Sequence, residues 1–227
     1  MGADTRSIYI ASAEGDTGKS TVALGMLELL SATGGRVGVF RPISRAAAGE
    51  SDYILELLIA HDSVDIPYED CIGVTYDQVH ADPDGAIAEI VSRFHAVESR
   101  CDTVLIIGSD YTDVGNPSEL SYNARIAANL SAPIILALNA SDRRPDEMRG
   151  LAEHLIAEIS AVHANTAALI ANRCDPADLR AVAHALEPIG IPAWCLPEDP
   201  ILFAPTMAEL AEALGASMYS GDEALLD

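Results

Sequence analysis

The residues with the clearest chemical signature lie near the N-terminus, in the stretch SAEGDTGKST (12–21). A short apolar run precedes this stretch and the amphipathic run VALGMLELLSA follows it, so it is predicted to join a strand to a helix. The backbone N–H groups of residues 15–20 would converge there on an anion, at the positive end of the helix dipole. Lys19 would add a cation for the β and γ phosphates, and the Ser20 hydroxyl would ligate Mg²⁺. The predicted chemistry is the binding of a nucleotide through its phosphates.

One position of this loop departs from the usual phosphate-binding motif, because Ala13 stands where the first glycine is expected. An alanine adds only one methyl group to the turn, so phosphate binding stays open. The alternative interpretation is that a glycine, a lysine and a serine follow a strand here by chance. The complete frame of strand, loop and helix favours the nucleotide site. The residues predicted to line it are Glu14, Gly15, Asp16, Thr17, Gly18, Lys19, Ser20 and Thr21.

The rest of the chain predicts the scaffold that must position this loop. Short apolar runs rich in β-branched residues alternate with longer runs of helical periodicity, which is typical of βαβ units. We expect an α/β fold with a doubly wound, mostly parallel sheet flanked by helices. Strands are expected at 7–12, 36–42, 102–109, 132–140, 166–173 and 191–197, and helices at 18–32, 52–61, 84–99, 119–130, 145–160, 176–187 and 206–215. The longest irregular pieces are expected at 41–51, 62–82, 109–118 and 197–205, and three of them follow the carboxyl end of a strand, where open α/β sheets bind ligands.

Length and charge limit the classes of protein to consider. A chain of 227 residues suffices for one large domain, expected over 1–219, with an acidic tail or linker over 220–227. The sequence has 35 acidic and 13 basic side chains, which give a formal net charge of −22. A surface this negative repels phosphate backbones and anionic lipids, so neither nucleic acid nor membrane partners are expected.

Cysteine spacing and hydropathy predict the compartment. The four cysteines show no C-x-x-C or zinc spacing and lie mostly inside apolar runs, which indicates free thiols in a reducing compartment. No stretch approaches the roughly 20 apolar residues that span a bilayer, and the N-terminus has no long apolar leader. A cytoplasmic protein is therefore expected.

The loop resembles that of dethiobiotin synthetase, which reads G-T-D-T-x-x-G-K followed by Ser or Thr. Glu14 falls on the aspartate of that motif, and Lys19 and Ser20 fall on its lysine and hydroxyl residue. The segment VGVFRPIS places Arg41 on the lysine that contacts the substrate carbamate, and GESDYI places Asp52 on a metal-binding aspartate. The resemblance implies ATP and Mg²⁺ as cofactors. On the residues alone, Arg41 stays open as a solvated strand-end charge and Asp52 as a helix cap.

The resemblance continues in the second half of the chain. The segment LIANR ends in Asn172 and Arg173, and the family implies that Asn172 reads the adenine edge. The segment LPEDP, with Pro197 and Glu198, resembles the neighbouring loop that flanks the base. The alternative for Asn172 is a turn residue at the end of a strand.

The sequence also departs from dethiobiotin synthetase in ways that bear on catalysis. Ile107 stands where the family has a glutamate that completes the Mg²⁺ shell, and Asp110 is the nearby carboxylate that would partly replace it. On the residues alone, Asp110 stays open as an ordinary loop carboxylate. Arg41 replaces a lysine, and a planar guanidinium does not reproduce the point charge of an ammonium. The segment SDYTDVGNPSEL replaces a glycine-rich one, so the diaminopelargonate pocket is not matched.

The chain resembles most the N-terminal domain of the long bacterial phosphate acetyltransferases, especially in its actinobacterial form. The segments YIASAEGDTGKSTVALGMLELL, CIGVTYDQVHADPDGAIAEIV and LPEDPILFAPTMAEL carry this resemblance, which runs from residue 7 to about 222. It implies a regulatory or nucleotide-sensing P-loop domain, in a fragment or a free-standing version of an enzyme that interconverts acetyl-CoA plus phosphate with acetyl phosphate plus CoA in acetate metabolism. The acyltransferase site would lie outside this chain. The implied partners are a nucleotide and downstream domains of the same polypeptide, and a homo-oligomer is left open.

Two other functions stay open at this point. In an ATP-dependent ligase similar to dethiobiotin synthetase, Lys19 and Arg41 would stabilise charge on the transferred γ-phosphoryl group, and Ser20, Asp52 and Asp110 would hold Mg²⁺. Alternatively, the domain is an interaction module with an empty loop. Turnover of diaminopelargonate, CO₂ and ATP separates the ligase from a regulatory domain, and nucleotide binding separates both from the interaction module.

Overall fold

The computed structural model describes residues 7–44, 51–109, 119–200 and 207–216. The chain divides into two compact units, Met1–Pro197 and Glu198–Asp227. The described part of the second unit contains helix α8 (Met207–Leu214), on which Met207, Leu210 and Leu214 are exposed. The expected boundary between residues 219 and 220 lies outside the described residues and stays a prediction.

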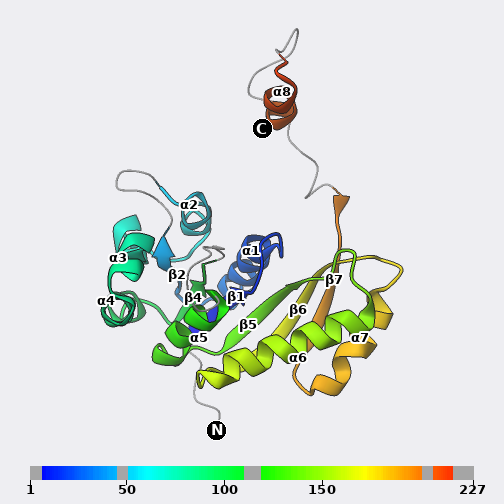
Figure 1. The fold of residues 1–227 in the computed structure, drawn as a ribbon. Helices are drawn as coiled ribbons and strands as arrows, with labels where there is room; N and C mark the ends of the chain where they lie inside the picture. Colours follow the sequence, from blue (N-terminus) through cyan, green and yellow to red (C-terminus); the bar gives the residue numbers. More distant parts are fainter. Residues whose placement is uncertain (1–6, 45–50, 110–118, 201–206, 217–227) are drawn as a thin grey trace. The chain divides into compact units, whose positions relative to one another are not determined.

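The first unit is built on a seven-stranded sheet with the strand order β3-β2-β4-β1-β5-β6-β7 (Figure 1). All neighbouring strands are parallel. The order reverses between β4 and β1, and in open α/β sheets the carboxyl ends of the strands at such a reversal form the ligand crevice. The predicted doubly wound, parallel sheet is confirmed. The strands are β1 (Ser7–Ser12), β2 (Val37–Ser44), β3 (Ile72–Thr75), β4 (Thr103–Ile107), β5 (Ile134–Asn139), β6 (Thr166–Cys174) and β7 (Ala193–Pro197).

Helices connect these strands and flank the sheet. Helices α4 to α7 pack against one another in succession, and α1 packs against α2 (Figure 1). Helix α6 begins at Pro145, as predicted, with Asp146 and Glu147 at the positive end of its dipole. The helices of the first unit are α1 (Lys19–Ser31), α2 (Tyr53–Ile59), α3 (Tyr76–Ala81), α4 (Pro83–Glu98), α5 (Glu119–Asn129), α6 (Pro145–Ala161) and α7 (Leu179–Leu186), with short 3₁₀ helices at Tyr68–Cys71 and Glu187–Ile189.

The expectation of a long irregular piece at 62–82 is wrong. This segment contains a 3₁₀ helix, the edge strand β3 and helix α3. Helix α3 begins with a capping box, in which the Thr75 hydroxyl and the Gln78 side chain bond each other's backbone N–H groups. Strand β2 also continues to Ser44, further than the sequence predicted.

Burial within the first unit separates an apolar core from a small charged cluster. The central strands are almost fully buried, and Phe40 on β2 meets Phe94 on α4 edge to face, with ring centroids 5.6 Å apart. Among the described residues, only three charged side chains are buried, namely Lys19, Arg41 and Asp52. Buried charges are costly unless they are paired, so their gathering at one place indicates a site rather than packing.

Two further observations concern the state of the cysteines and the apolar character of the helices. All four cysteines are free thiols, and three of them, Cys71, Cys101 and Cys174, are buried. No helix in the described parts of the chain has the length and apolar character needed to cross a membrane.

Candidate functional site

The loop predicted to bind phosphate joins the carboxyl end of β1 to the first residue of α1. Strand β1 ends at Ser12 and helix α1 begins at Lys19, so the predicted frame of strand, loop and helix is present. Gly18 caps the helix in a left-handed conformation with φ 69°, and Asp16 is left-handed as well, with φ 55°. The loop therefore turns sharply just before the helix N-terminus.

Two side chains at the end of β6 hold this loop through hydrogen bonds to two carbonyl groups of the loop. The Asn172 side-chain amide donates to the Thr17 carbonyl at 2.9 Å, and the Arg173 guanidinium donates to the Asp16 carbonyl at 3.2 Å. A Cβ atom on Gly18 would stand 2.2 Å from the Asn172 amide nitrogen and would have to displace it, and the left-handed φ of 69° also favours glycine at this position. The structure thus places Asn172 and Arg173 at the loop, and the role of Asn172 in reading a base stays a prediction.

These two hydrogen bonds also set the direction of the loop's amide groups. In a trans peptide the C=O and N–H groups point to opposite sides, so the N–H groups of Thr17 and Gly18 point away from β6. Within the described residues, no hydrogen bond to another protein atom uses the backbone N–H of Gly15, Asp16, Thr17 or Gly18. Consecutive N–H groups without a protein acceptor, next to a helix N-terminus, form a site suited to an anion.

Two buried cations meet at the carboxyl end of β4. Lys19, 3% exposed, donates from Nζ to the Gly108 carbonyl at 2.6 Å. Arg41, on β2, donates from Nη1 to the same carbonyl at 2.9 Å. Lys19 is also the only lysine of the sequence. The ammonium and the guanidinium that were predicted from the sequence therefore lie next to each other, and their common acceptor, the Gly108 carbonyl, was not predicted.

Asp52 balances the charge of Arg41. Its Oδ2 accepts from Arg41 Nε at 3.1 Å, and its Oδ1 accepts from the backbone N–H groups of Ile54 and Leu55. The two paired side chains are only 5% and 6% exposed. Arg41 is therefore not a solvated strand-end charge. Asp52 does cap helix α2, as one of the sequence alternatives expected, and it also pairs with Arg41.

Glu14 forms an ion pair that the sequence analysis did not predict. The guanidinium of Arg143, in the segment between β5 and α6, donates to both carboxylate oxygens of Glu14, at 2.5 and 2.8 Å. Arg143 also donates to the Asn139 carbonyl at the end of β5, at 2.8 Å. Glu14 is thus tied to the neighbouring strand end.

The remaining predicted site residues are placed as follows. Ser20 and Thr21 lie in the first turn of α1, with Ser20 half-buried and Thr21 exposed. Pro197 ends β7 and is exposed, Glu198 belongs to the second unit, and Asp110 lies outside the described residues. Ile107 is fully buried in the core. No group of three or more His, Cys, Asp or Glu side chains in the described ranges is arranged to hold a metal ion by itself.

The Gly108 position is expected to reject any side chain. A Cβ there would stand 2.6 Å from Asn123 Oδ1, 2.8 Å from Tyr9 Cε1 and 3.0 Å from the Ile10 carbonyl. Gly108→Ala is therefore expected to lower the free energy of unfolding by about 1–3 kcal/mol, the typical cost of overpacking. Urea unfolding measures this change. Gly25→Ala is the matched control: a Cβ at Gly25 on α1 meets nothing within 4 Å, so that variant should be no less stable than the wild type. Equal losses in both variants would contradict this prediction.

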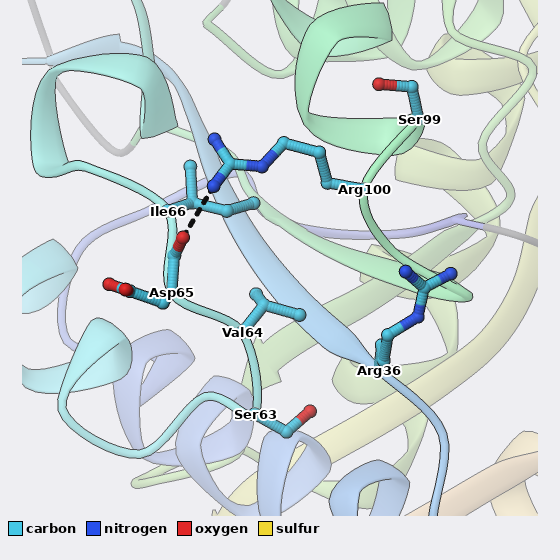
Figure 2. A pocket seen from close by; sticks show the side chains of 7 residues that line it. All are labelled: Arg36, Ser63, Val64, Asp65, Ile66, Ser99 and Arg100. Atoms are coloured by element: carbon cyan, nitrogen blue, oxygen red, sulfur yellow. Dashed lines mark hydrogen bonds between the residues drawn. The ribbon is translucent and has the colours of Figure 1, made fainter.

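A pocket of about 480 Å³ lies elsewhere, beside the start of β2 (Figure 2). Figure 2 shows the Arg100 side chain extended over it, with a hydrogen bond to the Asp65 carbonyl. Arg36, also at this pocket, is paired with the Asp102 carboxylate at 2.9 Å. None of the predicted site residues lines it, so the buried charges and the loop between β1 and α1 lie apart from this pocket. The pocket is lined by Arg36, Ser63, Val64, Asp65, Ile66, Ser99 and Arg100.

Sequence comparisons relate the chain to known proteins. A family model described as an AAA domain matches residues 6–206. Phosphate acetyltransferases of Nitratidesulfovibrio vulgaris and of a Synechocystis strain are each 27% identical to this chain, over 96% and 97% of its length. The matched regions make up 33% of each relative, so the chain spans about a third of the length of the curated relatives it matches.

Solved structures share the fold. McdA of Cyanothece in complex with ATP aligns with a TM-score of 0.52 at 16% identity, over 97% of this chain and 100% of that one. The septum site-determining protein MinD of Pyrococcus horikoshii, complexed with Mg-ADP, aligns with a TM-score of 0.52 at 20% identity, over 87% of this chain and 83% of that one. Identities this low show the common architecture alone.

Proposed function

The chain belongs to the AAA domain family, and on that premise we propose that it binds a nucleoside triphosphate on the loop between β1 and α1. The observation that carries this proposal is the row of backbone N–H groups, Gly15 to Gly18, that have no acceptor within the described protein. The Lys19 ammonium stands at the end of this row, held by the Gly108 carbonyl. Donors that are already oriented bind an anion without further ordering of the loop.

Mg²⁺ fits this site through oxygen donors. Ser20, in the first turn of α1, would hold the ion by its hydroxyl, together with phosphate oxygens. Asp52 would supply a second-sphere or direct carboxylate oxygen through Oδ2, which among the described residues accepts only the hydrogen bond from Arg41, whereas Oδ1 already accepts two from the backbone of α2. When bound, Mg²⁺ neutralises part of the phosphate charge. Asp110, which lies outside the described residues, remains a proposed ligand of Mg²⁺.

We favour a regulatory or nucleotide-sensing role over catalysis. The relatives are named phosphate acetyltransferases, and the matched region makes up only a third of each. Acetyl transfer would then belong to other parts of such a protein, and this domain would report nucleotide levels to them. Arg41 is committed to Asp52 and to a backbone carbonyl, so it is poorly placed to follow a reacting phosphoryl group. Ile107 supports the same conclusion, because it stands at the position where dethiobiotin synthetase has a metal-binding glutamate, and its apolar side chain is fully buried.

The second candidate is an ATP-dependent ligase similar to dethiobiotin synthetase. One observation favours it: Lys19 and Arg41 both donate to the Gly108 carbonyl, and two adjacent cations could share the charge of a transferred γ-phosphoryl group. Formation of dethiobiotin from diaminopelargonate, CO₂ and ATP would establish this activity, and its absence together with tight ATP binding would leave the regulatory role.

Calorimetric titration of the chain with ATP, ADP and AMP, each with and without Mg²⁺, tests the proposal. We expect a micromolar dissociation constant for ATP with Mg²⁺, and at least roughly tenfold weaker binding of AMP, because each lost phosphate removes charge-assisted hydrogen bonds. Equal affinities for the three nucleotides would mean that the loop does not hold the phosphates. No heat at millimolar ATP would leave the interaction module as the function.

A further inference from the structure

The phosphate-binding loop carries its own negative charge at Glu14, and one arginine neutralises it. Arg143 meets both carboxylate oxygens of Glu14, at 2.5 and 2.8 Å, across 129 positions of sequence. Two parallel hydrogen bonds fix the relative orientation of the two side chains as well as their distance. The pair is partly buried, with 30% and 35% of the side chains exposed, so solvent screens it less than an ion pair on the open surface.

Arg143 is itself anchored to the sheet. Its Nη1 donates to the Asn139 carbonyl at the end of β5, at 2.8 Å, while the Asn139 side chain accepts from the backbone N–H of Ser141. Asp142, between Ser141 and Arg143, has a left-handed backbone with φ 56°, so the chain turns tightly before Arg143. Through this anchor, Glu14 is connected to the end of β5, just as Asp16 and Thr17 are connected to β6.

We propose that Arg143 is a positioning residue of the nucleotide site, which holds Glu14 against the end of β5 and cancels its charge so that the loop can accept a polyphosphate. This inference rests on the proposed function. Glu14 directly precedes the N–H groups that would face the phosphates, and its uncompensated carboxylate would repel them. In this arrangement Glu14 serves as the partner of Arg143 and not as a metal ligand.

The test compares Arg143→Ala, Arg143→Lys and the double variant Glu14→Gln/Arg143→Ala with the wild type. Calorimetry with ATP and Mg²⁺ is expected to show binding weakened by roughly tenfold or more in Arg143→Ala, because a bare carboxylate then faces several phosphate charges. The double variant is expected to regain most of that affinity, because the repelling charge is gone. Arg143→Lys keeps the charge but cannot form the two parallel hydrogen bonds, so its affinity is expected to fall between those of the wild type and Arg143→Ala.

Arg144→Ala is the matched control. Arg144 is the next residue, has the same charge, is 70% exposed and pairs with Asp146 and Glu147 of its own helix. Its removal should leave ATP affinity unchanged. Failure of the double variant to regain affinity would overturn the proposal, since Arg143 would then act by direct contact with the nucleotide or by maintaining the fold. An equal loss in Arg144→Ala would overturn it too.

A readout without nucleotide separates this inference from the proposed function. If the wild type does not bind ATP, the proposed function fails, while amide hydrogen exchange of residues 13–21 still reports whether Arg143 holds the loop. We expect faster exchange of this segment in Arg143→Ala and in Glu14→Gln than in the wild type or in Arg144→Ala. Unchanged exchange in Arg143→Ala would show that the ion pair does not position the loop.

Discussion

Replacement of Asp52 with alanine is expected to lower the free energy of unfolding by about 3–5 kcal/mol, the usual effect of removing one partner from a buried ion pair. The variant would leave the Arg41 guanidinium, only 5% exposed, without its carboxylate. It would also remove the acceptor that caps α2 at the N–H groups of Ile54 and Leu55. Urea unfolding followed by circular dichroism measures the loss.

Asp82→Ala is the matched control for this variant. Asp82 caps helix α4 by accepting from the backbone N–H of Gly85, but it is exposed and neutralises no buried charge. Its removal is expected to cost only about 1 kcal/mol, the usual contribution of an N-cap. Comparable losses in the two variants would mean that Asp52 acts as a helix cap alone and that Arg41 does not need it.

Lys19→Ala is expected to weaken the binding of ATP at least about 100-fold, because a buried cation that faces phosphates makes strong, poorly screened hydrogen bonds. No other lysine in the sequence can take its place. The fold should survive, since the Gly108 carbonyl keeps its hydrogen bond from Arg41 at 2.9 Å. Titration calorimetry with ATP and Mg²⁺ checks this prediction.

Arg149→Ala removes the same charge elsewhere and serves as the control for Lys19→Ala. Arg149 lies on α6 and pairs with Glu153, where both side chains are about half exposed. Because exposed charges at a distance are screened, this variant should bind ATP like the wild type. If both variants lost affinity to the same extent, the effect would come from net charge and not from a lysine in the site.

The sequence predicted most of the scaffold because its buried strands are long and apolar. Strand β1 was predicted at the bounds it has, and β5 and β6 to within two residues at each end. Strand β3 was missed because IGVT is only four residues long and lies among polar residues, so no periodicity marks it. The capping box of Thr75 and Gln78 was the available signal for helix α3.

The site was predictable only where its chemistry resides in a local motif. The loop residues up to Thr21 stand next to one another in the sequence, so spacing alone identified them. Gly108 contributes a backbone carbonyl, and every residue has one, so its type gives no signal of this role. It also lies 89 positions from Lys19. Arg143 is one of two adjacent arginines, and only the turn after β5 determines which of them reaches Glu14. Contacts that depend on the spatial order of the strands cannot be predicted from the sequence of any one segment.

Amide hydrogen exchange with and without ATP and Mg²⁺, read for the peptide that covers residues 13–21, tests most directly whether the free N–H groups of this loop hold the phosphates. We predict strong protection of this peptide by the nucleotide and no change in a peptide from α6 (Pro145–Ala161), which lies outside the proposed site. Protection confined to another part of the chain, or no protection at saturating nucleotide, would contradict the assignment of this loop as the nucleotide site.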